Sequence, residues 1–244
     1  MPKDHYSETM NTENNIGTLT DYEGNVYSTK RFNVLATDGS VTYDLGWMTQ
    51  NLRSLKDSLG NWIDCPAGLY FNPAYYSSTQ QGVKVTTKIP DGIVGDYSID
   101  NIPISGQTYV EFVTEYGLGY TVDQAKRSCP QGWHLPTNQE WLDFFNNYGG
   151  LSSAGDIIKK NSGKQYISAD NKLTRWGASA TENGFNVVPT GYVLNADIPK
   201  TNYFGQHSLL IGVDVYFSIN PNSGIGSATP LANRRYSVRC IKNE

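Results

Sequence analysis

The sequence predicts a loop-rich α+β fold in which two short helices pack on small antiparallel sheets. Helical apolar periodicity is concentrated in two neighbouring windows between residues 121 and 148. Most other apolar runs are short, contain β-branched or aromatic residues and are bounded by turn residues, which is typical of strands. The composition agrees, because 17 Tyr, 5 Trp and 24 Gly among 244 residues favour strands and turns over helices.

The first part of the chain predicts a leader followed by strands. Residues 1–18 are polar and without periodicity, so we expect a flexible leader or linker. Order is expected to begin near Leu19, and a single domain is expected over residues 19–244, since a chain of this length can bury a sizeable core. A turn at residues 21–25 leads into a strand that reaches Leu35, and residues 46–52 predict another buried element.

The densest signals lie between Thr121 and Trp141. Thr121 to Gln124 and Thr137 to Glu140 each have the spacing of a capping box, which marks a helix start. Pro130 and Gly132 end the first helix, and the second helix is expected to stop before residues 149–150. These signals predict a tight helix-turn-helix corner at the core, in which Trp133 and His134 are packed and the imidazole is hydrogen-bonded to backbone.

The remaining elements are expected to be short. Residues 82–119 are interpreted as an insertion with strands at residues 83–87 and 108–113. Residues 151–160 predict a brief capped helix with basic residues at its end. Further strands are expected at residues 184–193, 207–217 and 235–241, the first of them interrupted by Pro189.

The charge pattern and the motifs exclude several functions. A net charge of -4 with both signs scattered does not fit a nucleic-acid partner, and no apolar run is long enough to span a membrane. Three histidines make a zinc site improbable, and neither a nucleophile elbow nor a P-loop occurs. We therefore expect no enzyme, although 23 acidic residues leave a glycoside hydrolase with paired carboxylates as a distant alternative.

Landmarks along most of the chain resemble those of the Fibrobacter succinogenes major paralogous domain family. They occur in the same order over residues 19–242 and are 21–27 (DYEGNVY), 47–52 (WMTQNL), 68–70 (GLY), 129–137 (CPQGWHLPT) with 140–141 (EW), 184–185 (GF) with 191–192 (GY), and 237–240 (SVRC). The chain departs from the family pattern in the length of residues 82–119 and at residues 209–212.

The resemblance implies a C-type-lectin-like layout and a place of action. It implies paired helices, a disulfide between Cys129 and Cys240 from the first helix to the last strand, and a long loop at a binding face; we then expect Cys65 to be free and buried. It also implies an exported bacterial protein at the cell surface or outer membrane, often a lipoprotein with a lipid anchor in the precursor, and it implies no catalytic residues.

The expected ligand-binding residues flank the long loop that precedes the strand at residues 207–217. They combine aromatic rings with amide, carboxylate and imidazole groups: Tyr192, Asn195, Asp197, Asn202, Tyr203 and His207. We expect no cofactor and no metal, because the Glu-Pro-Asn-like and Trp-Asn-Asp-like tripeptides of calcium-dependent lectins are absent. The alternative is a noncanonical calcium site formed by that loop together with Asp214.

These observations predict a non-catalytic binding or adhesion domain, an adhesin that recognises a glycan or a surface protein through its loops. The alternative from another class is a structural or assembly subunit of a bacterial envelope appendage, in which the insertion at residues 82–119 pairs with a neighbour.

Overall fold

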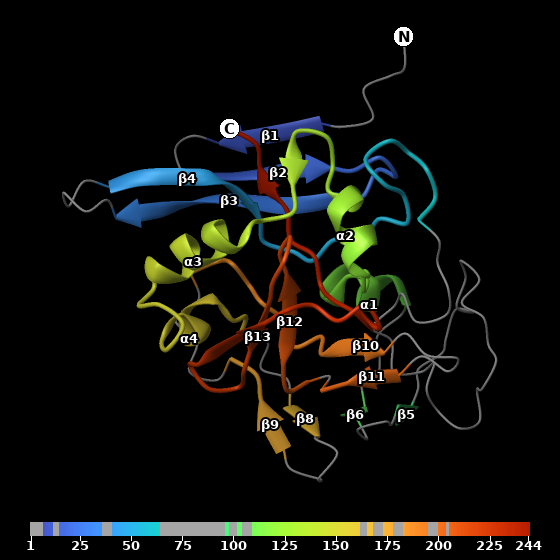
Figure 1. Ribbon diagram of the computed structural model, residues 1–244, viewed down its shortest axis with the longest axis vertical. Helices are drawn as coiled ribbons and strands as arrows, with labels where there is room; N and C mark the ends of the chain where they lie inside the picture. Colours follow the sequence, from blue (N-terminus) through green and yellow to red (C-terminus); the bar gives the residue numbers. More distant parts are fainter. Residues whose placement is uncertain are drawn as a thin grey trace.

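A computed structural model of the protein describes residues 7–11, 15–35, 41–63, 96–97, 102–103, 109–161, 165–167, 173–177, 183–194, 200–203 and 205–244. The fold is α+β, with curled antiparallel sheets and short helices (Figure 1). The largest sheet has six strands in the order β1-β2-β3-β4-β16-β7. Its strands are β1 (Ser7–Asn11), β2 (Ile16–Thr20), β3 (Val26–Leu35), β4 (Val41–Met48), β16 (Ile241–Lys242) and β7 (Trp133–His134).

Smaller antiparallel sheets form the other half of the molecule. One has the order β11-β10-β15, with β10 (Tyr192–Leu194), β11 (Lys200–Asn202) and β15 (Arg234–Arg235). Another has the order β12-β13-β14, with β12 (Ser208–Ile211), β13 (Tyr216–Ile219) and β14 (Ile225–Ala228). Two-stranded ribbons pair β5 (Asp96–Tyr97) with β6 (Ile102–Pro103) and β8 (Gln165–Ile167) with β9 (Leu173–Arg175).

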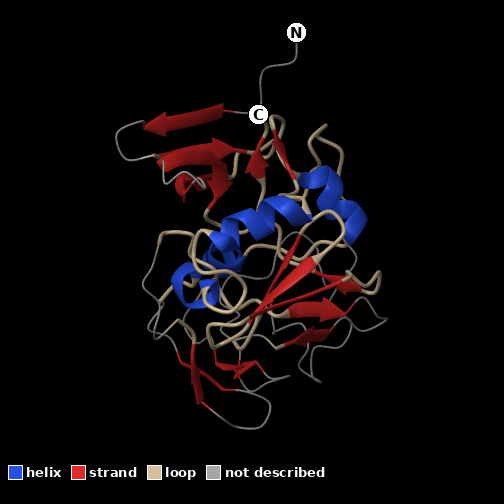
Figure 2. Cartoon of the chain, turned by 60° about the vertical axis from the view of Figure 1, so that its left-hand side comes forward, coloured by secondary structure: helices blue, strands red, loops and turns tan. Residues whose placement is uncertain are grey.

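Short helices lie between the large sheet and the small sheets (Figure 2). They are α1 (Tyr109–Tyr116), α2 (Val122–Ser128), α3 (Asn138–Asn146) and α4 (Ala154–Ile158). Among the described residues, no helix combines the length and the apolar content that crossing a bilayer requires.

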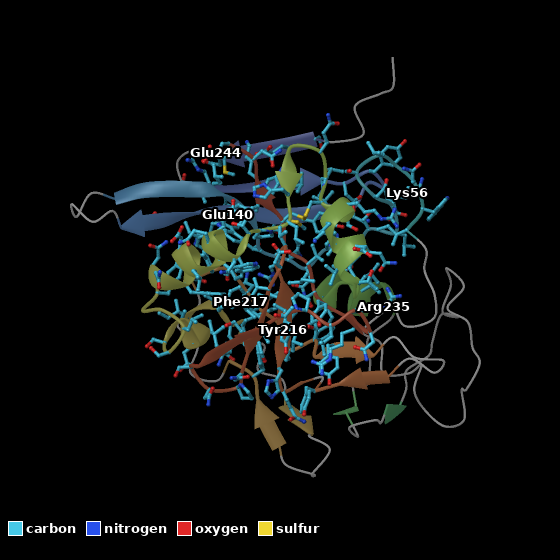
Figure 3. The ribbon with its side chains drawn as sticks, in the orientation of Figure 1. Lys56, Glu140, Tyr216, Phe217, Arg235 and Glu244 are labelled. Carbon is cyan, nitrogen blue, oxygen red and sulfur yellow. A yellow bond between two sulfur atoms is a disulfide. The ribbon has the colours of Figure 1, made fainter. Side chains whose placement is uncertain are left out.

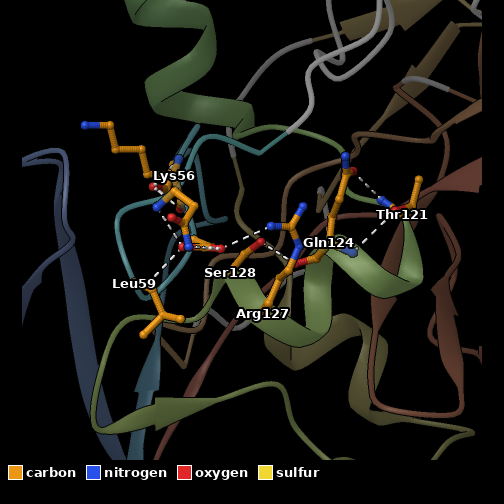
Figure 4. Close-up of polar contacts among 9 residues, drawn as sticks. Lys56, Leu59, Thr121, Gln124, Arg127 and Ser128 are labelled. Atoms are coloured by element: carbon orange, nitrogen blue, oxygen red, sulfur yellow. Dashed lines mark hydrogen bonds and ion pairs between the residues drawn. The ribbon is translucent and has the colours of Figure 1, made fainter.

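Both predicted capping boxes are confirmed. At α2, the Gln124 amide donates to Thr121 Oγ1 and the Thr121 amide donates to Gln124 Oε1 (3.4 and 3.0 Å), as Figure 4 shows. At α3, the Glu140 amide donates to Thr137 Oγ1 and the Thr137 amide donates to Glu140 Oε2 (3.2 and 2.7 Å). Each box satisfies backbone donors that would otherwise lack a partner, so the sequence fixes where both helices begin.

The expected disulfide is confirmed. Cys129, the C-cap of α2, is bonded to Cys240, which directly precedes β16, with their Cα atoms 5.7 Å apart. The bond appears in yellow beside α2 and β7 in Figure 3. Because it joins residues 111 positions apart, it ties the helical corner to the end of the chain and to β16, which lies between β4 and the edge strand β7 of the large sheet.

The core beneath the corner is aromatic. The Trp141 ring is stacked on Phe145, with centroids 5.4 Å apart, and lies 4.8 Å from Trp47 of β4. Phe144 lies 4.5 Å from Phe185. All these side chains are buried, so α3, β4 and the segment around residue 185 are joined by ring contacts instead of by backbone pairing.

Two loops beside the corner repeat one hydrogen-bonding pattern. In Asp21–Asn25 and again in Asp57–Asn61, the aspartate Oδ1 accepts from two backbone amides and its Oδ2 accepts from the asparagine amide group. The guanidinium of Arg127, in α2, also donates to Asp57 Oδ2 at 3.1 Å. The second loop is therefore fixed to α2, as the dashed lines from Arg127 in Figure 4 indicate.

Several expectations about the elements are wrong. Strand β1 and the first three residues of β2 lie within residues 1–18, where a flexible leader was expected; the polar pairs of these strands include a hydrogen bond between the Thr9 and Thr18 hydroxyls, which an apolar pattern does not reveal. The strand expected at residues 108–113 is helix α1, whose apolar residues also fit a helical face. Residues 83–87 and Cys65 lie outside the described residues.

The later elements are more interrupted than expected. Residues 207–217 form two strands instead of one, because Gly212 turns the chain by donating its amide to the Val215 carbonyl at 2.7 Å. In the strand expected at residues 184–193, only β10 is regular. Helix α4 is shorter than predicted, and Ser153 makes no side-chain cap. The His134 ring bonds to Glu140 and Asn243 side chains at 2.9 and 2.8 Å, not to backbone.

Candidate functional site

Three of the predicted binding residues lie together on the small sheets. The Tyr203 ring lies 4.9 Å from the His207 ring and 6.0 Å from the Tyr192 ring, measured between centroids. Tyr203 is 49% exposed, whereas Tyr192 is 9% exposed and His207 is half-buried. One ring is thus presented to solvent, and its two neighbours support it from below.

A tight turn presents the Tyr203 side chain. The amides of Gln206 and His207 both donate to the Tyr203 carbonyl at 3.0 Å, and the Gly205 amide donates to the Pro189 carbonyl at 2.8 Å. Tyr203 itself has φ of +57°, a left-handed conformation that is unfavourable for a bulky residue. Backbone strain of this kind is found preferentially at binding and active sites.

Arg234 completes a continuous row of π groups. Its guanidinium carbon lies 4.3 Å from the centroid of the Tyr192 ring, in cation–π geometry. The order along the row is therefore His207, Tyr203, Tyr192 and Arg234, and we call these four side chains the aromatic row. Arg234 Nε is buried and has no hydrogen-bond partner within the described part of the chain.

The sequence reasoning missed Arg234 and the tyrosine pair beside it. Tyr216 of β13 and Tyr236 lie 5.2 Å apart, and the Tyr236 hydroxyl accepts from the Leu231 amide at 2.8 Å. Tyr216 and the neighbouring buried Arg235 are labelled in Figure 3. Tyr216 lies earlier in the chain than Arg234, and the pairing of β15 with β10 brings Arg234 onto the Tyr192 ring.

Burial shifts the protonation equilibria of the row. Burial lowers the pKa of His207 below 6.5, opposed by a hydrogen bond with the Asn220 side chain, so the imidazole is neutral at pH 7. Burial also raises the pKa of Tyr192, while the Arg234 charge lowers it by less. At neutral pH the row consequently contains a neutral imidazole at His207 and a protonated phenol at Tyr192.

The other predicted site residues do not join the row in the described structure. Asn195 and Asp197 lie outside the described residues, and Asn202 is in β11, where only the backbone is described. The carboxylate of Asp214 lies 3.7 Å from the Lys126 ammonium. In the described ranges, no group of three or more His, Cys, Asp or Glu side chains is arranged to hold a metal.

Comparison with protein families decides the identity of the chain. A family model described as the Fibrobacter succinogenes major domain matches residues 44–242. The chain belongs to this family. Searches of curated proteins and of solved structures gave no match. The matched range of the Fibrobacter succinogenes major domain begins within β4 and includes the whole aromatic row, while β1, β2 and β3 precede it.

Within the Fibrobacter succinogenes major domain, the sequence landmarks converge on Arg239. Its fully buried guanidinium donates to Asn51 Oδ1 at 2.8 Å, to the Phe185 carbonyl and to the Asn186 carbonyl at 2.8 Å. Asn51 in turn donates to the Tyr116 carbonyl at 2.8 Å. Burial lowers the pKa of Arg239 to about 9, which leaves it charged at neutral pH. The landmarks around Arg239 therefore form a buried structural centre.

Proposed function

We propose that the protein is a non-catalytic binding domain that recognises a glycan through the aromatic row. The observation that supports this most directly is the row itself: an exposed ring on a strained, hydrogen-bonded turn, between an imidazole and a second phenol ring that carries a guanidinium. Aromatic faces pack against the C–H faces of sugar rings, and the flanking nitrogen groups can hydrogen-bond to sugar hydroxyls. No reaction has to be assumed for such a site.

The arrangement favours binding because contacts within the chain hold the row in place. Tyr203 is held by its turn, and Tyr192 is packed between Tyr203 and Arg234. Preorganised side chains lose less conformational entropy on binding than mobile ones. The unpaired Arg234 Nε is a donor that a ligand oxygen would satisfy, which would remove part of the cost of its burial.

We also propose that the domain acts outside the bacterial cytosol, at the cell surface or outer membrane. The disulfide supports this, because such bonds persist in oxidising compartments. A C-type-lectin-like arrangement is part of the proposal and is supported by the paired helices, the helix-to-last-strand disulfide and the small sheets that carry the row.

A glycan array with the full chain tests this function. The parent is expected to bind a defined set of glycans, and Tyr203→Ala is expected to lose that signal at least tenfold. Trp62→Ala is the matched control, since Trp62 is an exposed aromatic residue (64%) outside the row. No glycan binding by the folded parent, or equal binding by Tyr203→Ala, would overturn the proposal. A protein captured in a Tyr203-dependent way would replace the glycan with a protein ligand.

A further inference from the structure

A second concave site lies on different elements from the aromatic row. It is a cleft of about 330 Å³ between β3 and the C-terminal end of α3. The residues that line it are Lys30, Arg31, Phe32, Asn33, Asn147, Tyr148 and Asn183. Figure 1 places α3 and β3 well apart from β10 and β11, so a ligand in this cleft would not touch the row. The volume is at the lower end of the range for small-molecule sites.

Backbone irregularity on both sides opens this cleft. Arg31 pairs with Gly46 and Asn33 pairs with Tyr43, so Phe32 faces two residues of β4 instead of one. Such a bulge bends the ladder and redirects neighbouring side chains. On the other side, Asn147 caps α3, and the chain reverses after it at two glycines with positive φ, 87° and 74°.

The described lining of the cleft carries two cationic side chains. Lys30 and Arg31 supply two cations, Asn33, Asn147 and Asn183 supply amides, and none of the seven lining residues is acidic. The end of α3 contributes little negative potential, because its last carbonyls accept from the amides of residues 147–150. The charges of the described lining residues therefore favour an anion.

Lys30 and Asn183 are held in position at one end of the cleft. The Lys30 ammonium donates to the Asn183 carbonyl at 2.7 Å and lies 5.3 Å above the Phe32 ring. An ammonium has three donors, so this hydrogen bond leaves two for a ligand. Asn183 is fixed further by its amide, which donates to the Ile157 carbonyl, and by its Oδ1, which accepts from the Phe185 amide.

The Asn183 side chain retains one unpaired donor. Because Oδ1 is occupied by the Phe185 amide, the carboxamide orientation is determined by its environment. Asn183 Nδ2 is buried without a hydrogen-bond partner in the described residues. An unsatisfied buried donor is costly, and such donors need an explanation in a stable fold.

We propose that this cleft binds a carboxylate-bearing sugar residue of the uronic acid type. Lys30 would pair with the carboxylate, with the Arg31 charge beside it; the amides of Asn33 and Asn147 would hydrogen-bond to hydroxyls, and the half-buried Tyr148 ring would pack against the sugar ring. Cations, amides and a ring in one small cleft match a ligand that is anionic, hydroxylated and partly apolar. A bare inorganic anion would use only the cations.

The cleft binding stands independently of the glycan binding proposed for the aromatic row. It predicts a charge requirement that the row, with its single cation, does not impose. Titrations of the full chain with glucuronate and with glucose, followed by NMR or calorimetry, separate the two. We expect glucuronate to bind at least tenfold more tightly than glucose, and the difference to shrink at high salt.

Single-residue variants test whether glucuronate binds in this cleft. Lys30→Gln is expected to weaken glucuronate binding at least tenfold, whereas Lys126→Gln, which removes the same charge from an exposed position on α2, is expected to have no effect. Asn147→Ala is the second variant, to be used if Lys30→Gln does not fold, and a threefold or greater loss is expected. Tyr203→Ala is expected to leave glucuronate binding unchanged.

Three results would overturn the inference. They are equal binding of glucuronate and glucose, no saturable glucuronate binding by the folded parent, and competition by inorganic phosphate at concentrations as low as those of glucuronate. Loss of glucuronate binding in Tyr203→Ala would assign the ligand to the aromatic row instead. The glycan-array result with Tyr203→Ala does not depend on Lys30, so each proposal can fail separately.

Discussion

The helical corner at residues 121–141 and the aromatic row contain similar side chains but differ in construction. The corner is one continuous stretch in which Trp133 and Trp141 are buried, both helices are capped and a disulfide closes the end. The row is assembled from residues 192–234, on separate strands and turns, and its central ring is half-exposed. The aromatic rings of the corner are buried in the core, whereas the Tyr203 ring of the row is accessible to a ligand.

The difference also appears in the unfavourable features of each region. Along the row, Tyr203 has a positive φ and Arg234 Nε is buried without a partner among the described residues. In the corner, backbone donors are capped and ring contacts are dense; the exception is Trp141 Nε1, which has no hydrogen-bond partner in the part of the chain that the structure describes. We infer that the folding free energy contributed by the corner offsets the backbone strain and the unpaired donor of the row.

Removing the disulfide should have the largest effect. For a closed loop of this length, set by a separation of 111 residues, the double variant Cys129→Ala with Cys240→Ala should lose about 4 to 5 kcal/mol in urea unfolding. Parent protein unfolded in reductant is the control and should show a similar loss. Thiol counting without reductant should find one free thiol in the three-cysteine chain; three would contradict the bond.

Truncating Trp141 should be next in size. Its buried indole contacts Trp47 and Phe145, so Trp141→Ala should cost about 3 to 5 kcal/mol in thermal or urea unfolding. Trp141→Phe should cost less, because it keeps a ring and removes the unpaired Nε1 donor. If both variants were equally destabilised, ring packing would not be what the corner contributes.

The capping boxes should each contribute about 1 kcal/mol. The loss of unfolding free energy should be larger for Thr137→Ala than for Thr121→Ala, because the Thr137 hydroxyl also donates a hydrogen bond to Glu140 Oε2 at 2.8 Å. Urea unfolding of the two single variants provides the comparison. A larger loss for Thr121→Ala would show that the start of α2 matters more to the corner than the start of α3.

Tyr203→Asn should change stability in the opposite direction. Asparagine tolerates the left-handed conformation that Tyr203 adopts at φ of +57°, so stability should be unchanged or rise by about 1 kcal/mol or less. Ligand binding at the row should be lost. Destabilisation of Tyr203→Asn by more than the Trp62→Ala control would place Tyr203 with the core residues and contradict the contrast between the regions.

The two regions should also lose stability in different pH ranges on acidification. Burial puts the pKa of His207 below 6.5 in the folded state, so the unfolded state takes up more protons as pH falls from 6.5. At Glu140, burial raises the pKa, but hydrogen bonds from Thr137 and His134 lower it by more, to below 4.5. The stability that the ionised Glu140 carboxylate contributes is present above pH 4.5 and is lost as pH falls through the pKa of the folded state.

Unfolding free energy measured from pH 7 to pH 3 checks this order. His207→Asn should flatten the profile just below pH 6.5, and Glu140→Gln should flatten it only below pH 4.5. Flattening of the upper range by Glu140→Gln would mean that the corner, and not the row, responds first to acid.

Prediction from sequence succeeded where the determining contacts are local. The capping residues of α2 and α3 bond within three positions, so their spacing alone identified both helices. Helix α1 was mistaken for a strand because its apolar residues fit both periods; its end depends on Gly117 at positive φ and on the Asn51 side chain, which binds the Tyr116 carbonyl. The turn at Gly212 was missed because apolar residues continue on both sides of it.

The sequence by itself determined the α+β class, the helical corner, the family landmarks and the choice of Tyr192, Tyr203 and His207. Only the tertiary structure placed Arg234 on Tyr192 and formed the cleft at Lys30, since strand pairing and a bulge join residues that are distant in the chain. The physical reason is range: a cap or turn is encoded by neighbouring residues, whereas a binding surface depends on how separate elements pack.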